Sequence, residues 1–504
     1  MMMCGPFRHV SASEREHCLD PVPPAISSQD LSYCLKVQRQ TIMRCRVSFL
    51  VVFSITLLSL AKPAFPATAP STYSGYTGTD PKPIPSPPPV LGPMNSILTD
   101  PTFGSRILRV TDSKTAGGAS LISEDAGYFR TWNADSTAIK LMTTTGKSWW
   151  VEFDPVNFKV GDGSSRPTLH QLNFNYKWEW SAVDPDVLYF LNGNQLSKYS
   201  KSAEVVTHLG GPPSGEPVTY HVAVVGQDSW VCSAAGAGAQ GTYTKLFCLN
   251  PNSPSQSKFI DIANRTINGI SQVDSNWPTG QKIGIHSIFG SAGGTWLGVI
   301  FHGQSWGKGV AVLNLATNSW SLATGVLHQS GHPCLGHGRY VNGSGSTNGK
   351  DSRGAILRDP DHLMDSSRQK FLMQPELTIG WHDAEHSSWF NASTNPDAPI
   401  LFSRYNITKP PSPLPWYGEI IMAATDGSNT VWRFAHNHNG GGSFYGQSFA
   451  QISNDGRWAL FSSYWDGTLG ASTNSDSGMS TRLDTFIVEL VPAERSLNER
   501  VNVK

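Results

Sequence analysis

Four histidines in the C-terminal third are of the residue type that binds transition metals. His382 and His386 lie four residues apart, His436 and His438 form a His-x-His pair, and Gln447 follows shortly after. Imidazole nitrogen suits a borderline divalent cation such as manganese or zinc, and an amide side chain is a suitable polar neighbour. These five residues are therefore the candidate metal ligands. The alternative is that each imidazole only hydrogen-bonds a neighbouring loop.

Tryptophan is the second residue type with chemical meaning. The chain has 16 tryptophans, and many of them recur at the same point of a degenerate repeat, which is typical of core positions. Trp381, Trp389 and Trp416 instead lie in loop-like sequence. Because an exposed indole stacks well on a sugar ring, these three are the candidate substrate contacts.

The composition favours strands and argues against several classes of partner. Lysine and arginine total 38, aspartate and glutamate also total 38, and the net charge is zero. A nucleic-acid or anionic-membrane protein usually presents a basic face, so neither partner is expected. Only 15% of residues are charged, while Gly (48) and Pro (34) are frequent, which favours short strands and many turns over helices.

A degenerate repeat of strand, turn and strand fills residues 99–491. The clearest copy runs through Ser453-Asn454-Asp455-Gly456-Arg457-Trp458. Strand-built repeats of roughly 40–60 residues indicate a β-propeller. We therefore predict an all-β chain with a seven-bladed propeller, closed by a strand at Ile107–Val110, and a pair of β-sandwiches is the alternative. The predicted blades begin near Thr131, Trp178, His221, His286, His337, His382 and Gln447.

The N-terminal region has the pattern of an exported protein. Residues 43–69 combine a short basic segment, an apolar run and an Ala-x-Ala motif, which is typical of a secretory signal peptide. An uncleaved membrane anchor is the alternative. Residues 1–42 precede a good start methionine and are interpreted as a mis-called extension. Residues 70–98 are rich in Pro, Ser and Thr and predict an extended linker, and residues 492–504 a C-terminal tail. The mature protein is expected to be secreted or periplasmic, without a membrane span.

Three cysteines remain once the predicted leader is removed. Cys232 and Cys248 flank a glycine-rich turn, so they are placed to pair across a hairpin, and Cys334 is left over. Such a bond requires Cα atoms roughly 4.4–6.8 Å apart. Because no CxxC motif occurs, a structural zinc knuckle is not expected.

The Ser-Asn-Asp-Gly-Arg-Trp segment, with histidines heading the predicted inner strands, resembles TolB-like propellers. More narrowly, His436-Asn437-His438 before Ser453-Asn454-Asp455-Gly456 is similar to the oligogalacturonate lyase family. That resemblance implies a seven-bladed propeller that holds manganese and cleaves uronate chains by β-elimination. Two features differ from the family pattern. Arg433 stands where the family has a glutamine, and glycines 440–442 are inserted after the histidine pair.

If the chemistry is β-elimination, a base must remove a proton next to a carboxylate and a cation must stabilise the enolate. His221 and His286, expected at the mouth of the propeller, are the candidate bases, with Tyr220 adjacent to the first. Arg339 and Arg433 are candidate cations. In the alternative interpretation these residues pack the blades or lie on the surface.

Three functions remain open at this stage. The first is a metal-dependent lyase that acts on acidic polysaccharide. The second is a non-enzymatic propeller that binds glycans or proteins outside the cytoplasm. The third is a glycosidase with paired carboxylates. Fold alone does not decide among them. In each case the protein is expected to be a monomer.

Overall fold

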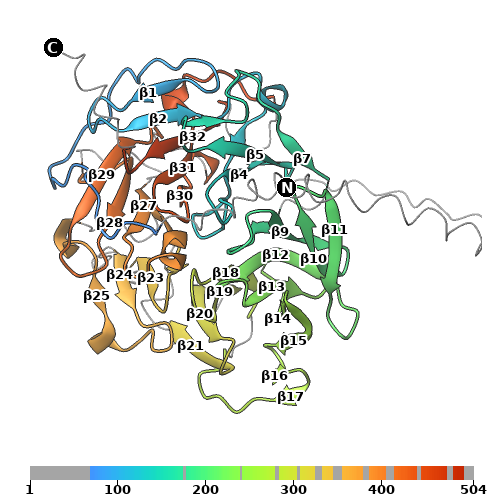
Figure 1. Cartoon of the computed structure of the whole chain (residues 1–504). Coiled ribbons are helices and arrows are strands. Elements are labelled where there is room, and N and C mark those ends of the chain that lie inside the picture. The colour runs from blue at the N-terminus through green and yellow to red at the C-terminus, as the bar shows by residue number, and fades with distance from the viewer. Residues whose placement is uncertain are drawn as a thin grey trace, which may run out of the picture. The chain divides into compact units, whose positions relative to one another are not determined.

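The structure is a computed structural model. It describes residues 68–173, 177–238, 241–278, 283–303, 307–323, 332–343, 355–377, 385–404, 414–439, 444–473 and 481–492. Within these ranges there is no α-helix, and the strands form seven antiparallel sheets arranged in a ring (Figure 1). The chain is therefore a seven-bladed β-propeller, as predicted, and the β-sandwich alternative is wrong.

The first three blades follow one another along the chain. Blade 1 has β3 (Leu121–Ile122), β4 (Ala138–Thr143), β5 (Ser148–Asp154), β6 (Lys159–Val160) and β7 (His170–Leu172). Blade 2 has β8 (Glu179–Trp180), β9 (Val187–Asn192), β10 (Gln195–Ser200) and β11 (Val205–Gly210). Blade 3 has β12 (Val218–Val225), β13 (Trp230–Ala235), β14 (Lys245–Asn250), β15 (Ser253–Asp261), β16 (Thr266–Ile267) and β17 (Ile270–Ser271).

Blades 4 to 6 have four strands each. Blade 4 has β18 (Ile285–Gly290), β19 (Trp296–Gly303), β20 (Gly307–Asn314) and β21 (Ser319–Ala323). Blade 5 has β22 (Cys334–Leu335), β23 (Tyr340–Gly343), β24 (Ala355–Arg358) and β25 (Lys370–Phe371). Blade 6 has β26 (Glu385–Ser388), β27 (Ile400–Arg404), β28 (Glu419–Ala423) and β29 (Val431–His436).

Blade 7 joins the two ends of the propeller. It has β30 (Gln451–Ile452), β31 (Trp458–Ser463) and β32 (Asp484–Glu489), followed outward by the N-terminal strands β2 (Arg106–Arg109) and β1 (Ile97–Thr99). The short 3-10 helices are η2 (Thr115–Gly118), η4 (Ser366–Arg368), η5 (Pro375–Leu377), η6 (Phe390–Ser393), η7 (Phe444–Gly446) and η8 (Trp465–Gly467).

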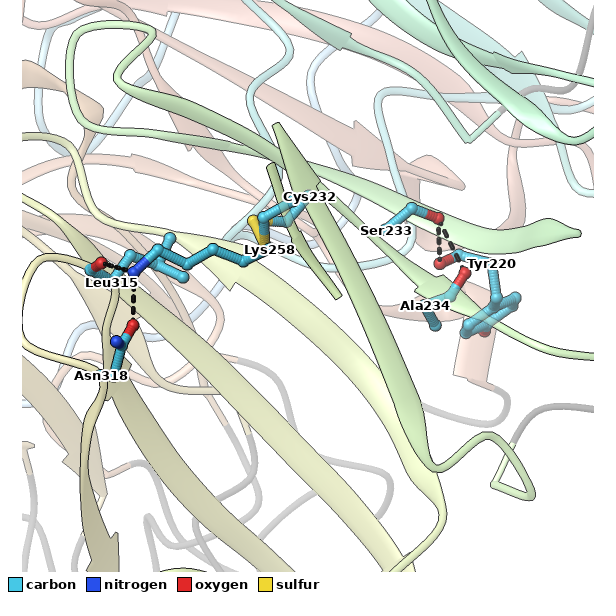
Figure 2. The surroundings of a disulfide bond; sticks show 8 residues. Tyr220, Cys232, Ser233, Ala234, Lys258, Leu315 and Asn318 are labelled. Carbon is cyan, nitrogen blue, oxygen red and sulfur yellow. Dashed lines mark hydrogen bonds between the residues drawn. A yellow bond between two sulfur atoms is a disulfide. The ribbon is translucent and has the colours of Figure 1, made fainter. Parts of the chain in front are cut away.

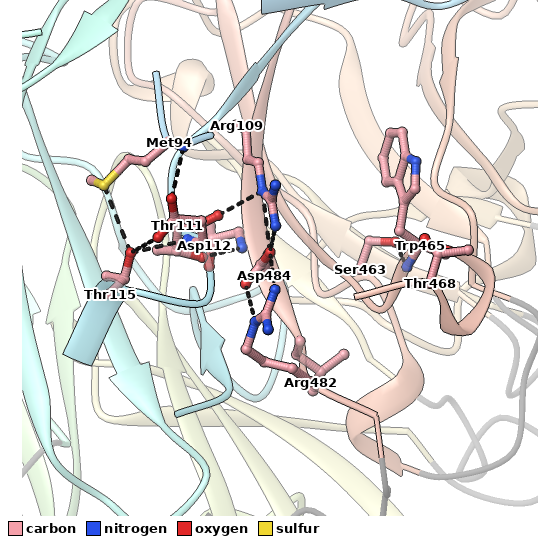
Figure 3. A network of polar contacts seen from close by, with 12 residues as sticks. Met94, Arg109, Thr111, Asp112, Thr115, Ser463, Trp465, Thr468, Arg482 and Asp484 are labelled. Atoms are coloured by element: carbon pink, nitrogen blue, oxygen red, sulfur yellow. Dashed lines mark hydrogen bonds and ion pairs between the residues drawn. The ribbon is translucent and has the colours of Figure 1, made fainter. Parts of the chain in front are cut away.

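The predicted closing strand is confirmed, and an ion-pair network fixes it (Figure 3). Ile107, Leu108 and Arg109 on β2 pair with β32. Arg109 donates to Asp484 on β32 at 2.5 Å, and Arg482 donates to the same carboxylate at 3.0 Å. The Asp484 side chain is only 1% exposed, so the bond that closes the ring lies in the protein interior. The pairing of the N-terminal strand with the C-terminal blade closes the propeller.

Each blade is covered on both faces by its neighbours, which explains why its middle strands are apolar on both faces. In the core between blades 3 and 4, Ala223 and Val225 of β12 lie in one cluster with Ile288, Val299 and Leu313 of blade 4. The burial of apolar area by such clusters is the main favourable term in folding. It also fixes the radial position of each inner strand, and therefore of the side chains at the channel.

The predicted disulfide is confirmed (Figure 2). Cys232 on β13 and Cys248 on β14 are bonded and face each other in the same register, with Cα atoms 4.1 Å apart, slightly closer than the predicted range. The remaining cysteine of the described residues, Cys334, is buried and free. Close to the disulfide, Lys258 donates to Leu315 O at 2.6 Å and so links blade 3 to blade 4.

The predicted blade starts agree with most inner strands. Trp178 immediately precedes β8, His221 and His286 lie on β12 and β18, and Gln447 precedes β30. The fifth start is displaced, because the inner strand β22 ends before His337, and His382 lies outside the described residues.

The interpretation of residues 70–98 as a simple solvated tether is wrong. Tyr73 is buried and donates to Gly456 O at 2.8 Å, and Pro89 O accepts from Trp465 Nε1 at 2.8 Å. Tyr76 forms a β-bridge with Arg433. We call residues 68–96 the N-terminal strap, because they lie along blades 6 and 7 before β1 begins. In the described part of the chain no helix is long and apolar enough to cross a membrane.

Candidate functional site at the channel mouth

The inner strand of blade 1 is interrupted by a segment that enters the central channel. Ile122 pairs with Met142, and Trp132 pairs with Ile139 of the same strand β4. These partners on β4 are three residues apart, whereas Ile122 and Trp132 are ten apart, so seven extra residues leave the strand. We call residues 123–131 the channel segment.

The channel segment contacts every other blade, combining aromatic contacts with hydrogen bonds. Because these contacts go in all directions around the ring, the segment fills the centre of the propeller. From blade 2 to blade 7 the contacts are Arg130 N to Glu179 Oε1 (3.2 Å), Phe129 to His221 (ring centroids 4.8 Å), Tyr128 to Phe289 (5.1 Å), Tyr128 to His332 (6.3 Å), Arg130 over Phe390 (4.5 Å) and Gln451 Nε2 to Ala126 O (3.1 Å).

Two carboxylates of the channel segment are paired with two lysines. Glu124 binds Lys140 of β4, whose Nζ also donates to Trp178 O at 2.8 Å. Asp125 binds Lys177 at 2.6 Å. Burial raises the pKa of Glu124 and lowers that of Lys140. Burial alone would raise the pKa of Asp125, but the Lys177 ammonium holds it below its ordinary value.

Glu179 on β8 is a third carboxylate of the channel, and it is bound by backbone groups. Its oxygens accept from Arg130 N at 3.2 Å and from Val224 N at 2.8 Å. Burial nevertheless raises the pKa of Glu179 to about 7, because two amide donors and a nearby guanidinium only partly replace the hydration of the charge. Glu179 therefore titrates near neutral pH.

His221 lies on β12 with a backbone conformation that is unusual for its residue type. Its φ is 54°, and the pairing of β12 with β13 shifts register between Tyr220 and Val222, where His221 lies. The ring stacks on Tyr220 at 4.0 Å, and neither ring nitrogen has a hydrogen-bond partner among the described residues. Burial, followed by the Lys177 charge, lowers the pKa of His221 well below 6.5, so the ring is neutral. Strained backbone and unpaired buried nitrogen together are features that concentrate at functional sites.

A second imidazole group lies across the channel in blades 5 and 6. His386 of β26 contacts Gln447 Oε1 through Nε2 at 2.6 Å and stacks on His332 at 3.9 Å. Gln447 and His386 are two of the five candidate metal ligands, and they are in contact here. Burial lowers the pKa of His386 to about 4, although the Gln447 contact opposes the shift. The Asp125 charge favours the protonated form of both His386 and His221 and so opposes the lowering of their pKa by burial.

The part of this arrangement that reaches solvent is the end of the channel where the inner strands begin, here called the mouth. Tyr220, His286 and His332 are half-buried there, and the Asp125 side chain is 25% exposed. Lys177, which binds Asp125, is only 4% exposed. Deeper still, the space between Glu124, Lys177 and His221 is too narrow for a water molecule. Among the described residues, the polar groups beneath Asp125 are therefore closely packed at this point of the channel.

Two of the predicted metal ligands lie elsewhere. His436 ends β29, the outermost strand of blade 6, whereas His386 lies on β26, the innermost strand. Three strand spacings of roughly 4.8 Å separate them, or about 14 Å, so they cannot share one ion. The prediction that His436 and His438 lead into an inner strand at the mouth is wrong, since the chain crosses to blade 7 only after them. His382 lies outside the described residues.

Instead, the histidine pair packs at the outer edge of the propeller. His436 N donates to Asp100 Oδ2 at 2.8 Å, and its ring lies 4.9 Å from Phe103. His438 Nδ1 contacts Asp466 at 3.0 Å. Within the described ranges, no three His, Cys, Asp or Glu side chains form a group suited to a metal ion.

The predicted cations do not reach the mouth. Arg433 also lies on β29, is fully buried, and binds both oxygens of Glu419 at 2.6 and 2.7 Å. Its remaining donor binds Gly78 O and Asp80 O of the N-terminal strap, so its role is structural. Arg339 is partly exposed and pairs with Asp397 at 3.3 Å.

The predicted sugar-stacking tryptophans are also wrong where the structure describes them. Trp389 and Trp416 are each 1% exposed and belong to the core of blades 4 to 6. Trp389 Nε1 donates to Ala398 O at 2.8 Å. Loop-like sequence misled here, because a turn residue can still point into the space between two blades. Trp381 lies outside the described residues.

Sequence analysis missed the charged members of the site. The inner hairpins were placed correctly, but the buried charged side chains in or beside them were not recognised. These are Lys140, Lys177 and Glu179. The available signal was their position, because a charged residue within an otherwise apolar inner strand must find a partner in the channel. The channel segment itself has no periodicity that would distinguish it from an ordinary loop.

The fold and its closure place this chain among the seven-bladed β-propellers. No family model matches it, and no curated protein matches it. Among solved structures, an oligogalacturonate lyase from Vibrio parahaemolyticus is 9% identical, with 80% of this chain and 97% of that chain covered and a TM-score of 0.48.

Two further structures show the range of the similarity. An oligogalacturonate lyase in complex with manganese is 10% identical over 78% of this chain and 96% of that one, with a TM-score of 0.32. U3-55K is 12% identical over 74% and 98%, with a TM-score of 0.37. Oligogalacturonate lyases are thus among the similar structures, as the sequence pattern predicted, but likeness at this level concerns the fold and carries no functional argument.

Proposed function

We propose that this chain is an exported β-propeller that binds an acidic glycan at the mouth of its channel. The observation that carries the proposal is the Lys177–Asp125 ion pair, whose carboxylate partner is the more exposed. Half-buried rings lie at the start of the inner strands of blades 3, 4 and 5, namely Tyr220, His286 and His332. Aromatic and imidazole rings offer flat faces to sugar rings, and a lysine ammonium is a partner for a carboxylate.

The Lys177–Asp125 pair supports an acidic ligand over a neutral one. Asp125 is the exposed partner and Lys177 the buried one. A sugar carboxylate that approaches the mouth can take the place of the Asp125 carboxylate at Nζ, whereas a neutral sugar supplies no charge to the ammonium. The exchange keeps Lys177 paired and therefore avoids the cost of a buried unpaired cation.

A divalent metal is not included in the proposal. Manganese or zinc requires several nitrogen or oxygen ligands around one point. His386 and His332 face each other by stacking, the Nε2 atom of His386 is already in contact with Gln447, and the His436–His438 pair is at the far edge of the blade. The described residues therefore do not fit a divalent metal.

A second function, β-elimination from a uronate, is favoured by His221. A neutral imidazole with no hydrogen-bond partner among the described residues can accept a proton, and Lys177 is close enough to influence its charge. The ring is only 2% exposed, with Tyr220 stacked against it. Catalysis therefore requires Tyr220 to move when the glycan binds.

Binding is tested with uronate oligosaccharides and neutral oligosaccharides of equal length, by calorimetry on the whole exported chain. We expect uronate binding that weakens at least tenfold in Lys177→Met. Lys245→Met is the matched control, because Lys245 also forms an ion pair, with Glu216, but lies on β14, the third strand of blade 3. Equal affinity for neutral and acidic oligosaccharides would contradict the proposal.

Two rim variants keep the test independent of folding. Tyr220→Ala and His286→Ala alter half-buried rings, and each should weaken uronate binding while leaving the melting temperature within a few degrees of the wild type. Ultraviolet absorbance of unsaturated uronate then separates the two functions. Its appearance in wild type and its loss in His221→Gln indicates a lyase, and binding without it indicates a binding protein.

A further inference from the structure

Arg130, in the channel segment, is a buried cation with unused donors. The residue is completely buried, and its guanidinium lies over the Phe390 ring at 4.5 Å. Nη1 donates to Asn454 Oδ1 at 2.8 Å. Nε and Nη2 have no acceptor in the part of the chain that the structure describes. A guanidinium stays charged in proteins, so these two N–H groups carry positive charge without a partner.

Four other arginines show what this edge of the guanidinium binds. In Arg106 and Arg433, Nε and Nη2 contact the two oxygens of one glutamate, and in Arg109 and Arg482 the same two atoms contact Asp484. The parallel N–H groups of this edge suit a single anionic group. Arg130 differs from these four arginines, because its Nε and Nη2 contact no carboxylate among the described residues.

The carboxylates nearest to Arg130 are already used by other donors. Both oxygens of Glu179 accept backbone N–H groups, one of them from Arg130 itself. Asp228 accepts from Ser181 at 2.5 Å and from Tyr189 at 2.8 Å. Neither carboxylate forms an ion pair with the guanidinium among the described residues. The charge of Arg130 is therefore compensated only at a distance.

We propose that a small monovalent anion, chloride under physiological conditions, binds Nε and Nη2 of Arg130 in the interior of the propeller. A neutral water would accept the hydrogen bonds but would leave the buried positive charge unpaired, which is the costly term. Because the residue is completely buried, only a small ion fits the requirement. The anion accepts hydrogen bonds from Arg130 and balances its charge, as the Glu419 carboxylate does for Arg433.

Bromide is the probe for this site, because it replaces chloride and gives an anomalous diffraction signal. Crystals of the exported chain grown in sodium bromide should show a bromine peak within hydrogen-bonding distance of Nε and Nη2. An ordered water there, or no peak at all, would overturn the proposal. So would a peak that appears only on the protein surface.

The linked solution measurement is the melting temperature at constant ionic strength, with bromide replacing gluconate. A ligand that binds only the folded state stabilises it, so we expect a saturable rise on the order of a few degrees. Arg130→Met should abolish the rise. Arg482→Met is the matched control, because Arg482 is also buried but its Nε and Nη2 already donate to Asp484, and it should retain the rise.

A bromide-dependent rise that persists in Arg130→Met would assign the effect to another site and contradict the proposal. If Arg130→Met does not fold, the diffraction experiment on the wild type decides alone. Neither measurement depends on glycan binding, so the anion site and the proposed function can fail separately.

Discussion

At the residue scale, the channel is organised by charges that are neutralised in pairs. Glu124 pairs with Lys140 and Asp125 with Lys177, all inside a ring of apolar blades. Such pairs seldom add net stability, since desolvation offsets their attraction, but breaking one leaves a buried charge. Here the two ion pairs fix the position of the channel segment along the channel axis, and they hold Asp125 at the mouth.

At the same scale, Glu179 makes the free energy of unfolding depend on pH. Its folded pKa of about 7 lies above the ordinary value of 4.5, so the folded state holds a proton that the unfolded state has released. The resulting stability is present below about pH 4.5 and is lost as the pH rises through about 7. Relative to Glu179→Gln, the wild type should lose on the order of 3 kcal/mol of unfolding free energy between pH 5 and 8.

Urea denaturation at several pH values measures this difference. Glu152, an exposed carboxylate on β5, provides the control, and Glu152→Gln should leave the pH profile of the wild type unchanged. A difference between wild type and Glu179→Gln that stays constant from pH 5 to 8 would show that Glu179 is already ionised throughout.

At the element scale, the features that depend on local sequence pattern were predicted correctly. Alternating apolar runs and Asn-Asp-Gly turns located β30, β31 and most other inner hairpins, and the closing strand β2 was identified because it stands alone before the first repeat. The disulfide was predictable because both cysteines flank one hairpin. These features are fixed by residues close together in the chain.

What depends on long-range contacts could not be predicted from the sequence. The N-terminal strap looks like a tether because its partners, such as Gly456, lie nearly four hundred residues away. The metal prediction failed for a related reason. Assigning His436 to the mouth required knowing which strand of its blade it ends, and a His-x-His spacing is the same on an inner or an outer strand.

The channel segment provides a prediction at this scale through Gly127. A Cβ at this position would lie 2.6 Å from Ser387 O and 3.1 Å from Ala450 O, which are backbone atoms of blades 6 and 7. Since neither can move without shifting an inner strand, Gly127→Ala should lower the unfolding free energy by about 1–3 kcal/mol, typical of overpacking. Chemical denaturation measures the loss.

Gly193→Ala is the control for this substitution. Gly193 has a φ of 58°, and no atom lies within 4 Å of the point that a Cβ would occupy, so its variant has only the backbone cost, about 1 kcal/mol. If Gly127→Ala is no more destabilising than Gly193→Ala, the channel segment is not packed against blades 6 and 7.

At the scale of the whole molecule, the N-terminal strap limits where a leader can be removed from the chain. Ala69 O accepts from Asn395 Nδ2 at 2.8 Å, and Tyr73, whose ring lies 5.6 Å from Phe434, is part of the blade 6–7 core. Removing Tyr73 would expose apolar surface between the last two blades. The cut must therefore fall before it.

We accordingly predict that mass spectrometry of the exported protein finds an N-terminus between Pro63 and Thr72, as the Ala-x-Ala motif indicates. A chain made to begin after Tyr73 should melt at a lower temperature. It lacks the packed Tyr73 ring, and the loss of a buried aromatic side chain costs about 3–5 kcal/mol in protein cores. A chain made to begin at Thr72 should melt close to the natural product. An exported protein that retains residues 47–60 would contradict cleavage, and a stable natural product that lacks Tyr73 would contradict the structural role of the N-terminal strap.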